Sequence, residues 1–300
     1  EQLRYRYILQ DKDSNICKLS LSHGDELAYQ LEKADSAWIM TEPLQNTVAV
    51  DSSQVSSLVT TLIQLQIDDF GAQDVREADY AKYNLDKNCY VFQITQENGD
   101  VTTLRFEDYD PLVSSYINCL NEETGEIWRF DSSYVTFLQG KTTTYLLKTV
   151  CKVGIDEISA MSIQYNGSYN DRTLSIDTTF GVDYENKKYT CNGTDISTYG
   201  DAALTAFQDM FSQVSSLTYT EIQLDSDPPE NGTPSLTITY TLKDGTTRIV
   251  ELVKRDDTTY WARVDGVYTR TIVRQNALSG NGKMLEKYSE LMTVISSSAS

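Results

Sequence analysis

The chain has 300 residues, enough for one large or two medium domains with a sizeable core. It carries 44 acidic and 25 basic side chains, a formal net charge of −19. A field of this sign repels phosphate backbones and anionic headgroups, so the sequence predicts no nucleic acid as a partner. No apolar run approaches the roughly 20 residues that a membrane-spanning helix needs.

The first residues form a strand-like run, Leu3–Leu9, and the chain begins without a methionine. We interpret this as a natural sequence cut short at its N-terminus, and we expect a membrane anchor ahead of it. On this interpretation the protein touches the membrane only through that anchor, which is absent from the sequence given.

Two local patterns come next. Asp11–Asn15 offers the first three ligand positions of a calcium loop, but Ile16 stands at the required glycine and Ser22 at the final glutamate. A hairpin turn is the better interpretation. In the following strand, Cys17 shares a face with two leucines and is predicted to be a small core residue.

A helix is predicted after the capping run Asp51-Ser52-Ser53, because apolar residues then recur at 3.6-residue spacing. They are Val55, Leu58, Val59, Leu62 and Leu65. The aromatic strand segment Trp38-Ile39-Met40 precedes this helix. A hairpin follows it, with alternating apolar residues at 90–94 and 104–106 around the turn Asn98-Gly99. Strands are also predicted at 116–119 and 127–130.

The same order recurs in the second half of the chain. Ile158, Met161 and Ile163 resemble Ile16, Leu19 and Leu21. A helix after Asp201 carries Phe207, Phe211 and Val214, which align at a constant offset with Leu58, Leu62 and Leu65. The segment Tyr189-Thr190-Cys191 precedes it, and a hairpin around Asp244-Gly245 and strands at 260–263 and 267–268 follow. Asn-Gly and Asp-Gly are expected to supply the positive φ angles of two-residue hairpins.

These patterns predict an α+β fold: two tandem copies of a mostly antiparallel sheet packed with one main amphipathic helix, plus a C-terminal helix. The predicted domains are residues 1–143 and 144–300. A short helical stretch at 76–82 belongs to the first copy only. The C-terminal helix, with an apolar face from Met284 to Ile295, is interpreted as an ordinary packed helix in preference to a partner-binding one.

Several of these segments, in this order, resemble a bacterial family called domain of unknown function 4340. They are Trp38–Pro43, the capped helix after Asp51, Tyr83-Asn84-Leu85, the Asn98-Gly99 hairpin and Phe130–Ser133. Where the family usually has Tyr-Gly-Leu, this chain has Asn84, and asparagine tolerates the left-handed conformation that such a turn needs. The resemblance implies a membrane-anchored protein facing outward from a bacterial cell, often beside gliding-type ABC-transporter components. It implies no catalytic residues.

Candidate chemistry is sparse. The single histidine, His23, lies in a turn-like stretch, and triads and most catalytic zinc sites need histidine. Residues 277–284 look superficially like a phosphate loop but have Ala277 for the first glycine and Met284 for the Ser/Thr, so a loop before a helix is predicted. The five cysteines include no close pair, and whether any form disulfides stays open. Trp38 and Trp128 are interpreted as core residues matched by Tyr189 and Tyr268.

We therefore predict no catalytic, cofactor-binding or metal residues, no cofactor and no enzymatic activity. The predicted function is that of an extracytoplasmic, membrane-anchored cell-envelope protein that binds or braces a protein partner, such as an ABC-transporter component, through exposed strand edges. The alternative is a small-ligand or carbohydrate binder that uses the crevice between the repeats. A hydrolase that uses a pair of carboxylates ranks last, because no pair can be picked out.

Overall fold

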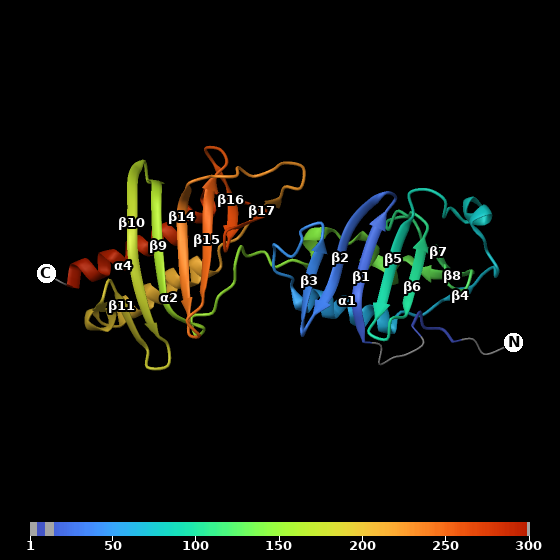
Figure 1. Ribbon diagram of the computed structural model, residues 1–300, viewed down its shortest axis with the longest axis horizontal. Helices are drawn as coiled ribbons and strands as arrows, with labels where there is room; N and C mark the ends of the chain where they lie inside the picture. The colour runs from blue at the N-terminus through green and yellow to red at the C-terminus, as the bar shows by residue number, and fades with distance from the viewer. Residues whose placement is uncertain (1–4, 10–14, 299–300) are drawn as a thin grey trace. The chain divides into compact units, whose positions relative to one another are not determined.

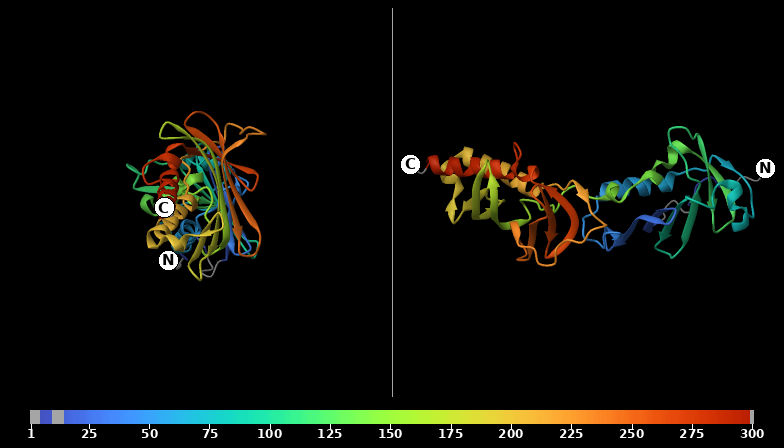
Figure 2. Two further views of the ribbon diagram at one scale, coloured as in Figure 1. Left: turned by 90° about the vertical axis from the view of Figure 1, so that its left-hand side faces the viewer. Right: turned by 90° about the horizontal axis from the view of Figure 1, so that it is seen from above.

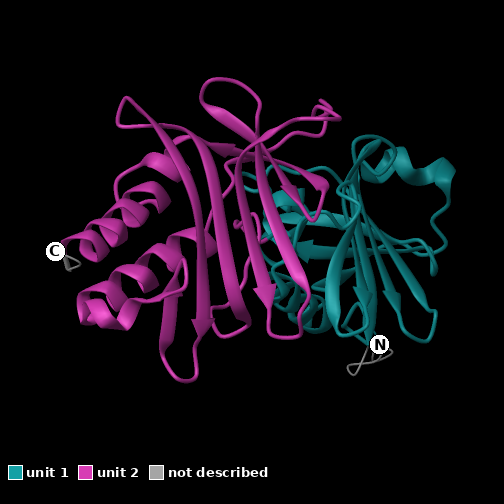
Figure 3. Cartoon of the chain, turned by 60° about the vertical axis from the view of Figure 1, so that its left-hand side comes forward, with its two compact units in different colours: residues 1–146 teal, residues 147–300 magenta. Residues whose placement is uncertain are grey.

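The fold is described from a computed structural model that covers residues 5–9 and 15–298. The chain forms two compact units, residues 1–146 and 147–300 (Figures 1 and 3). The sequence predicted the joint after residue 143. Most of the calcium-loop-like segment Asp11–Asn15 lies outside the described residues. Among those residues, no helix combines the length and the hydropathy needed to cross a membrane.

The first unit is built on one eight-stranded antiparallel sheet with the order β3-β2-β1-β5-β6-β7-β8-β4. Its strands are β1 (Ile16–His23), β2 (Glu26–Ala34), β3 (Ala37–Glu42), β4 (Asp69–Phe70), β5 (Tyr90–Gln96), β6 (Val101–Phe106), β7 (Tyr116–Asn121) and β8 (Glu126–Asp131). Its helices are α1 (Ser52–Gln64) and the 3-10 helices η1 (Glu77–Tyr83), η2 (Ser132–Gln139) and η3 (Thr142–Tyr145).

The second unit has a nine-stranded antiparallel sheet with the order β12-β11-β10-β9-β14-β15-β16-β17-β13. Its strands are β9 (Ile158–Tyr169), β10 (Arg172–Asp183), β11 (Lys188–Cys191), β12 (Thr194–Asp195), β13 (Glu221–Ile222), β14 (Pro234–Leu242), β15 (Thr247–Lys254), β16 (Thr259–Val264) and β17 (Val267–Arg274). Its helices are η4 (Ile196–Tyr199), α2 (Asp201–Ser215), α3 (Asn276–Ser279) and α4 (Met284–Ser298). In each unit the long helices lie along one face of the sheet (Figure 2).

The two sheets share one strand order. Reading from the same edge, β3, β2, β1, β5, β6, β7, β8 and β4 correspond to β11, β10, β9, β14, β15, β16, β17 and β13. Among the described strands, β12 alone has no counterpart. The register agrees as well, since Leu21 faces Phe92 across β1 and β5, and Ile163 faces Ile238 across β9 and β14. The α+β class with two antiparallel sheets and a C-terminal helix is therefore confirmed.

The two long helices of the repeat form where their apolar spacing predicted. Asp51 caps α1, and its carboxylate accepts hydrogen bonds from the Ser53 backbone N–H at 3.0 Å and from the Ser53 hydroxyl. Both helices bury an apolar stripe that contains most of the predicted residues: Val55, Leu58 and Leu62 in α1, and Phe207, Phe211 and Val214 in α2. Val59 is only half-buried, and α2 also buries Ala203 and Met210.

The predicted alignment of the two helices was wrong by about one turn. The backbone N–H of Ile8 donates to the Leu65 carbonyl, and that of Val150 donates to the Leu217 carbonyl. Leu65 therefore corresponds to Leu217, whereas the sequence matched it with Val214. An apolar stripe recurs every three to four residues, so a shift of one turn leaves it in place and hides the error.

The turns of the two matching hairpins also differ from the prediction. Gly99 and Gly245 have φ values of 90° and 87°, but Asn98 and Asp244 are not in the left-handed region. In each hairpin the glycine N–H bonds back to the residue three positions earlier, which makes a turn followed by a bulge glycine, not a two-residue loop. Asn84, by contrast, has φ 57° and ψ 36°, the left-handed conformation that the sequence suggested.

The small apolar residues and the C-terminal helix complete the cores. All five cysteines are free thiols. Cys17 is half-buried, not a core residue, because a register shift between Ile16 and Lys18 interrupts the alternation of β1. In α4, Met284, Leu285, Tyr288 and Leu291 are buried, and the helix packs on α2 as the packed interpretation predicted.

Candidate functional site

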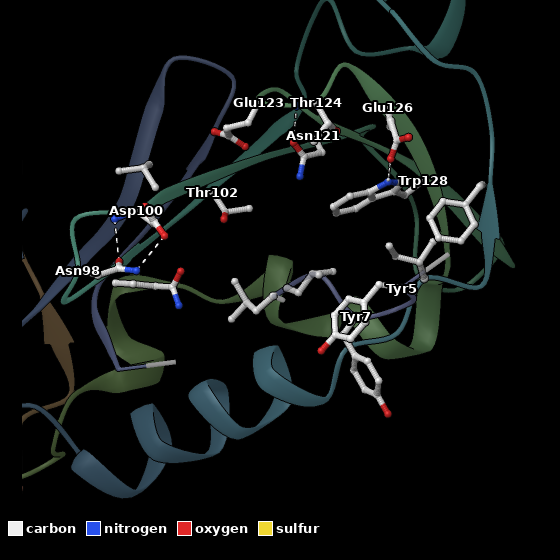
Figure 4. A pocket seen from close by; sticks show the side chains of 16 residues that line it. Tyr5, Tyr7, Asn98, Asp100, Thr102, Asn121, Glu123, Thr124, Glu126 and Trp128 are labelled. Atoms are coloured by element: carbon white, nitrogen blue, oxygen red, sulfur yellow. Dashed lines mark hydrogen bonds between the residues drawn. The ribbon is translucent and has the colours of Figure 1, made fainter. Parts of the chain in front are cut away.

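The first unit contains a cavity of about 650 Å³, within the ~300–1,000 Å³ typical of small-molecule sites. Its walls come from the segment Tyr5–Leu9, from the turn between β5 and β6, and from the hairpin of β7 and β8 (Figure 4). Every one of these elements belongs to the first unit, on the sheet face that also carries Phe106 and Phe130.

Three carboxylates line this cavity, and hydrogen bonds from the chain fix each of them. Glu123 accepts two bonds from the Thr103 backbone N–H, at 2.8 and 3.0 Å. Asp100 accepts from the Asn98 side-chain amide at 2.8 Å, and Glu126 accepts from the Trp128 indole at 3.2 Å. No lysine or arginine is found among the described lining residues. The described lining is therefore rich in acceptors, and its carboxylates disfavour an anion.

Asn121, the last residue of β7, places an amide at the cavity. Its side-chain oxygen accepts from the Thr124 backbone N–H at 2.9 Å and so holds the β7–β8 turn. The residue is only 6% exposed, and Figure 4 shows its side chain pointing into the cavity. Within the described part of the chain, no residue accepts a hydrogen bond from its Nδ2. This Nδ2 is open to the cavity and is not among the fully buried polar atoms without a partner. A group that closed over it would need an acceptor, because a buried amide donor left unpaired costs about 1–3 kcal/mol.

Trp128 places an aromatic ring beside this amide. Trp128 is buried, with 6% exposure, as its interpretation as a core residue predicted. Its indole also lines the cavity. Its predicted match in the second copy, Tyr268, was wrong. Phe70 of β4 faces Trp128, and Ile222 of β13 faces Thr271, so the equivalent residue is Thr271. Trp38 is half-buried on β3 and does correspond to Tyr189.

The second unit carries different residues at the equivalent positions. The register matches Thr102 with Arg248 and Asn121 with Val264. Arg248 forms an ion pair with Asp265 at 2.5 Å. Thus the second copy has an apolar side chain at the position of Asn121 and an ion-paired arginine at the position of Thr102. The shared fold does not depend on Asn121 or Trp128.

A second feature of the first unit is the loop between β6 and β7, whose apex we call the Leu112–Val113 tip. Leu112 is 91% exposed and Val113 is 77% exposed, more than any other large apolar side chain described. The tip is an ordered turn, because Asp110 accepts hydrogen bonds from the Leu112 and Val113 backbone N–H groups. The base of the tip is held to η2 by Ser132, whose hydroxyl donates to the Ser114 carbonyl and whose backbone N–H donates to the Ser115 carbonyl.

Two exposed tyrosines flank the base of the tip in the sequence. Tyr116 and Tyr134 lie close in sequence to the Ser132 contact and are 52% and 59% exposed. In the second unit the matching loop between β15 and β16 has the polar sequence Arg255–Thr258, and its Asp257 pairs with Lys254. Exposed adjacent aliphatic residues are therefore a property of the first copy and not of the fold.

The candidates singled out from the sequence lie elsewhere. His23 ends β1 directly before a turn, stacks on Tyr90 with ring centroids 4.1 Å apart, and has its Nε2 3.3 Å from Asp108. Burial raises the pKa of the Tyr90 hydroxyl, and a hydrogen bond from Gln139 opposes this. A neighbouring tyrosine with a raised pKa is a poor nucleophile, so this group does not assemble a catalytic triad.

The phosphate-loop-like segment is structural. Residues 277–284 form α3 and the turn before α4, where the Gly282 N–H donates to the Glu286 carboxylate, so the predicted loop before a helix is confirmed. No group of three or more His, Cys, Asp or Glu residues in the described parts of the chain could hold a metal ion.

The thiol closest to the cavity along β7 is Cys119. Burial raises its pKa well above the usual range, and Glu122 adds to this effect. It is therefore held as a neutral thiol and is unsuited to nucleophilic chemistry. The cavity combines hydrogen-bond acceptors, an amide donor and an aromatic ring.

These features define the class: an α+β protein of two like units, with its distinctive surface features in the first. Residues 1–88 match the family described as Domain of unknown function (DUF4340), which confirms the resemblance noted in the sequence. No curated protein and no solved structure matches the chain. The sequence analysis missed both the cavity and the Leu112–Val113 tip. For the tip a signal existed, an apolar pair between Asp110-Pro111 and Ser114-Ser115.

Proposed function

We propose that the chain is a non-enzymatic, extracytoplasmic domain of a membrane-anchored bacterial envelope protein that binds a protein partner, such as an ABC-transporter component, through the Leu112–Val113 tip. The observation that carries this proposal is the exposure of both side chains on a turn that is fixed by hydrogen bonds. Burying a leucine and a valine in a partner contributes about 1.5–3 kcal/mol each, and an ordered turn loses little entropy on binding.

The charges around the tip indicate the chemistry of the partner surface. Glu107, Asp108 and Asp110 precede the apolar pair, and the protein as a whole is strongly acidic. A partner that accepts the tip should offer an apolar depression with basic residues at its rim. Anionic lipid headgroups are disfavoured by the same charges. The sequence proposed exposed strand edges as the means of binding, and the tip is a more specific candidate.

The compartment and the absence of catalysis are parts of the same proposal. The family resemblance of the first unit supports a location outside the cytoplasm. The exposed, unassembled environment of His23 and the neutral thiol of Cys119 support a non-enzymatic role. Protease added to intact cells tests the location, and degradation of the full-length protein only after lysis would contradict it.

The partner is tested by purifying the full-length anchored protein from its native membranes. The double variant Leu112→Ser/Val113→Ser is compared with Asp257→Ser, which alters an exposed residue in the matching loop of the second unit. We expect wild type and Asp257→Ser to retain one partner in stoichiometric amount and the tip variant to lose it at least ~10-fold, about 1.4 kcal/mol. Equal recovery with the tip variant, or no stoichiometric partner with wild type, would overturn the proposal.

A further inference from the structure

We propose that the cavity of the first unit is a binding site for a neutral saccharide, held by Asn121, the cavity carboxylates and Trp128. This inference goes beyond the proposed function and is independent of it, because the cavity and the Leu112–Val113 tip are separate features. The sequence analysis placed a carbohydrate site between the repeats, whereas the residues that suit one lie within residues 5–128.

The amide of Asn121 sets the first requirement on the ligand. Its Nδ2 opens into the cavity, no described residue accepts from it, and a ligand lying over it would bury this donor. The ligand must therefore carry an acceptor. A purely cationic ligand such as a polyamine supplies donors only and would leave this amide unpaired.

The carboxylates set the second requirement. Asp100 and Glu123 are fixed by hydrogen bonds that use only part of their acceptor capacity, and the described lining has no basic side chain. The ligand must carry donors, and the described carboxylates disfavour an anion. Hydroxyl groups meet both requirements, because each one donates to a carboxylate and accepts from an amide.

Trp128 adds a flat apolar surface beside these polar groups. A saccharide presents apolar C–H faces between its hydroxyl edges, so an indole flanked by an amide and a carboxylate matches one pyranose ring. The second unit has Val264 and Thr271 at these two positions. Since that unit forms the same sheet without them, packing alone does not account for Asn121 and Trp128.

The test titrates the full chain with maltotriose, cellotriose and triacetylchitotriose, and with spermidine as a cationic probe, while calorimetry and tryptophan fluorescence are recorded. We expect at least one trisaccharide to bind and to change the fluorescence, and Trp128→Phe to abolish that change. Binding of spermidine alone, or of none of the probes at millimolar concentration, would overturn the inference.

Asn121→Asp keeps the oxygen that holds the turn and removes the donor. We expect it to weaken trisaccharide binding at least ~10-fold. Asn118→Asp is the matched control, because it adds the same charge to β7 three residues away, on the opposite face. If Asn121→Asp fails to fold by circular dichroism, Thr102→Val replaces it and should weaken binding several-fold. Affinity unchanged in the folded variant would refute the assignment.

Discussion

Leu19 and Met161 occupy the same position in two different sheets. Each lies on an interior strand of its sheet, Leu19 between β2 and β5 and Met161 between β10 and β14, and both are fully buried. Their side chains differ in shape, yet the strand order and register around them are the same. The pattern of burial, more than the identity of the residues, therefore specifies this fold.

Tyr219 carries a defect that a single substitution can remove. Its hydroxyl is buried and has no hydrogen-bond partner among the described residues. Tyr219→Phe should raise the free energy of unfolding by about 1 kcal/mol, because it removes an unpaired polar group and leaves the ring. Tyr165→Phe is the control: its hydroxyl donates to the Ser168 carbonyl at 3.1 Å, so its loss should destabilise by a similar amount. Urea unfolding measures both, and equal effects of the same sign would contradict this account.

The buried tyrosines also predict instability at alkaline pH. Burial raises the pKa of Tyr219 to about 12 and that of Tyr260 to about 12. In the unfolded chain these hydroxyls ionise near pH 10, so the unfolded state loses protons first and stability falls as pH rises from about 10 to 12. Each group lowers the free energy of unfolding by at most ~1.4 kcal/mol per pH unit in this window. The slope measured from pH 9.5 to 11.5 should be shallower in Tyr219→Phe, and an unchanged slope would show that Tyr219 does not contribute.

The free cysteines predict an order of reaction with a maleimide reagent. Cys17 is half-buried, whereas Cys119 is buried and its raised pKa keeps it neutral. In the native protein at pH 7.5, Cys17 should react first and Cys119 last, as mass spectrometry of peptides can measure. In denaturant without reductant all five thiols should react. Fewer than five would reveal a disulfide, and early labelling of Cys119 would contradict its burial.

Much of the fold could be predicted from the sequence because its elements follow simple periods. Alternation around residues 90–94 and 236–240 predicted the two hairpins, and the 3.6-residue spacing after Asp51 predicted α1. The recurrence of these elements in one order predicted the repeat. Such patterns are local, and the structure places each of them in a matching position.

Other details could not be predicted, for identifiable reasons. The alignment of α1 with α2 slipped by about one turn because a helical stripe looks the same after three or four residues. The turns at Asn98-Gly99 and Asp244-Gly245 require a positive φ only at the glycine, which the dipeptide alone does not reveal. Short elements such as β4 and β13 have two residues each and no period to read.

The cavity was beyond sequence reasoning because its residues are distant along the chain. Tyr5, Asp100 and Asn121 meet only when the segment before β1 lies beside the β5–β6 and β7–β8 hairpins. In the sequence, Asn121 looks like any other asparagine beside a turn. Its interest arises from the burial of the residue and from an Nδ2 that faces the cavity, and neither can be seen without a structure.

The claim that partner binding resides in the Leu112–Val113 tip is tested most directly by photo-crosslinking in living cells. A benzophenone amino acid replaces Leu112 in one full-length protein and Asp257, in the matching loop of the second unit, in another. After irradiation we predict one discrete crosslinked product from position 112 and none from position 257. No product from 112, or the same product from both positions, would contradict the account.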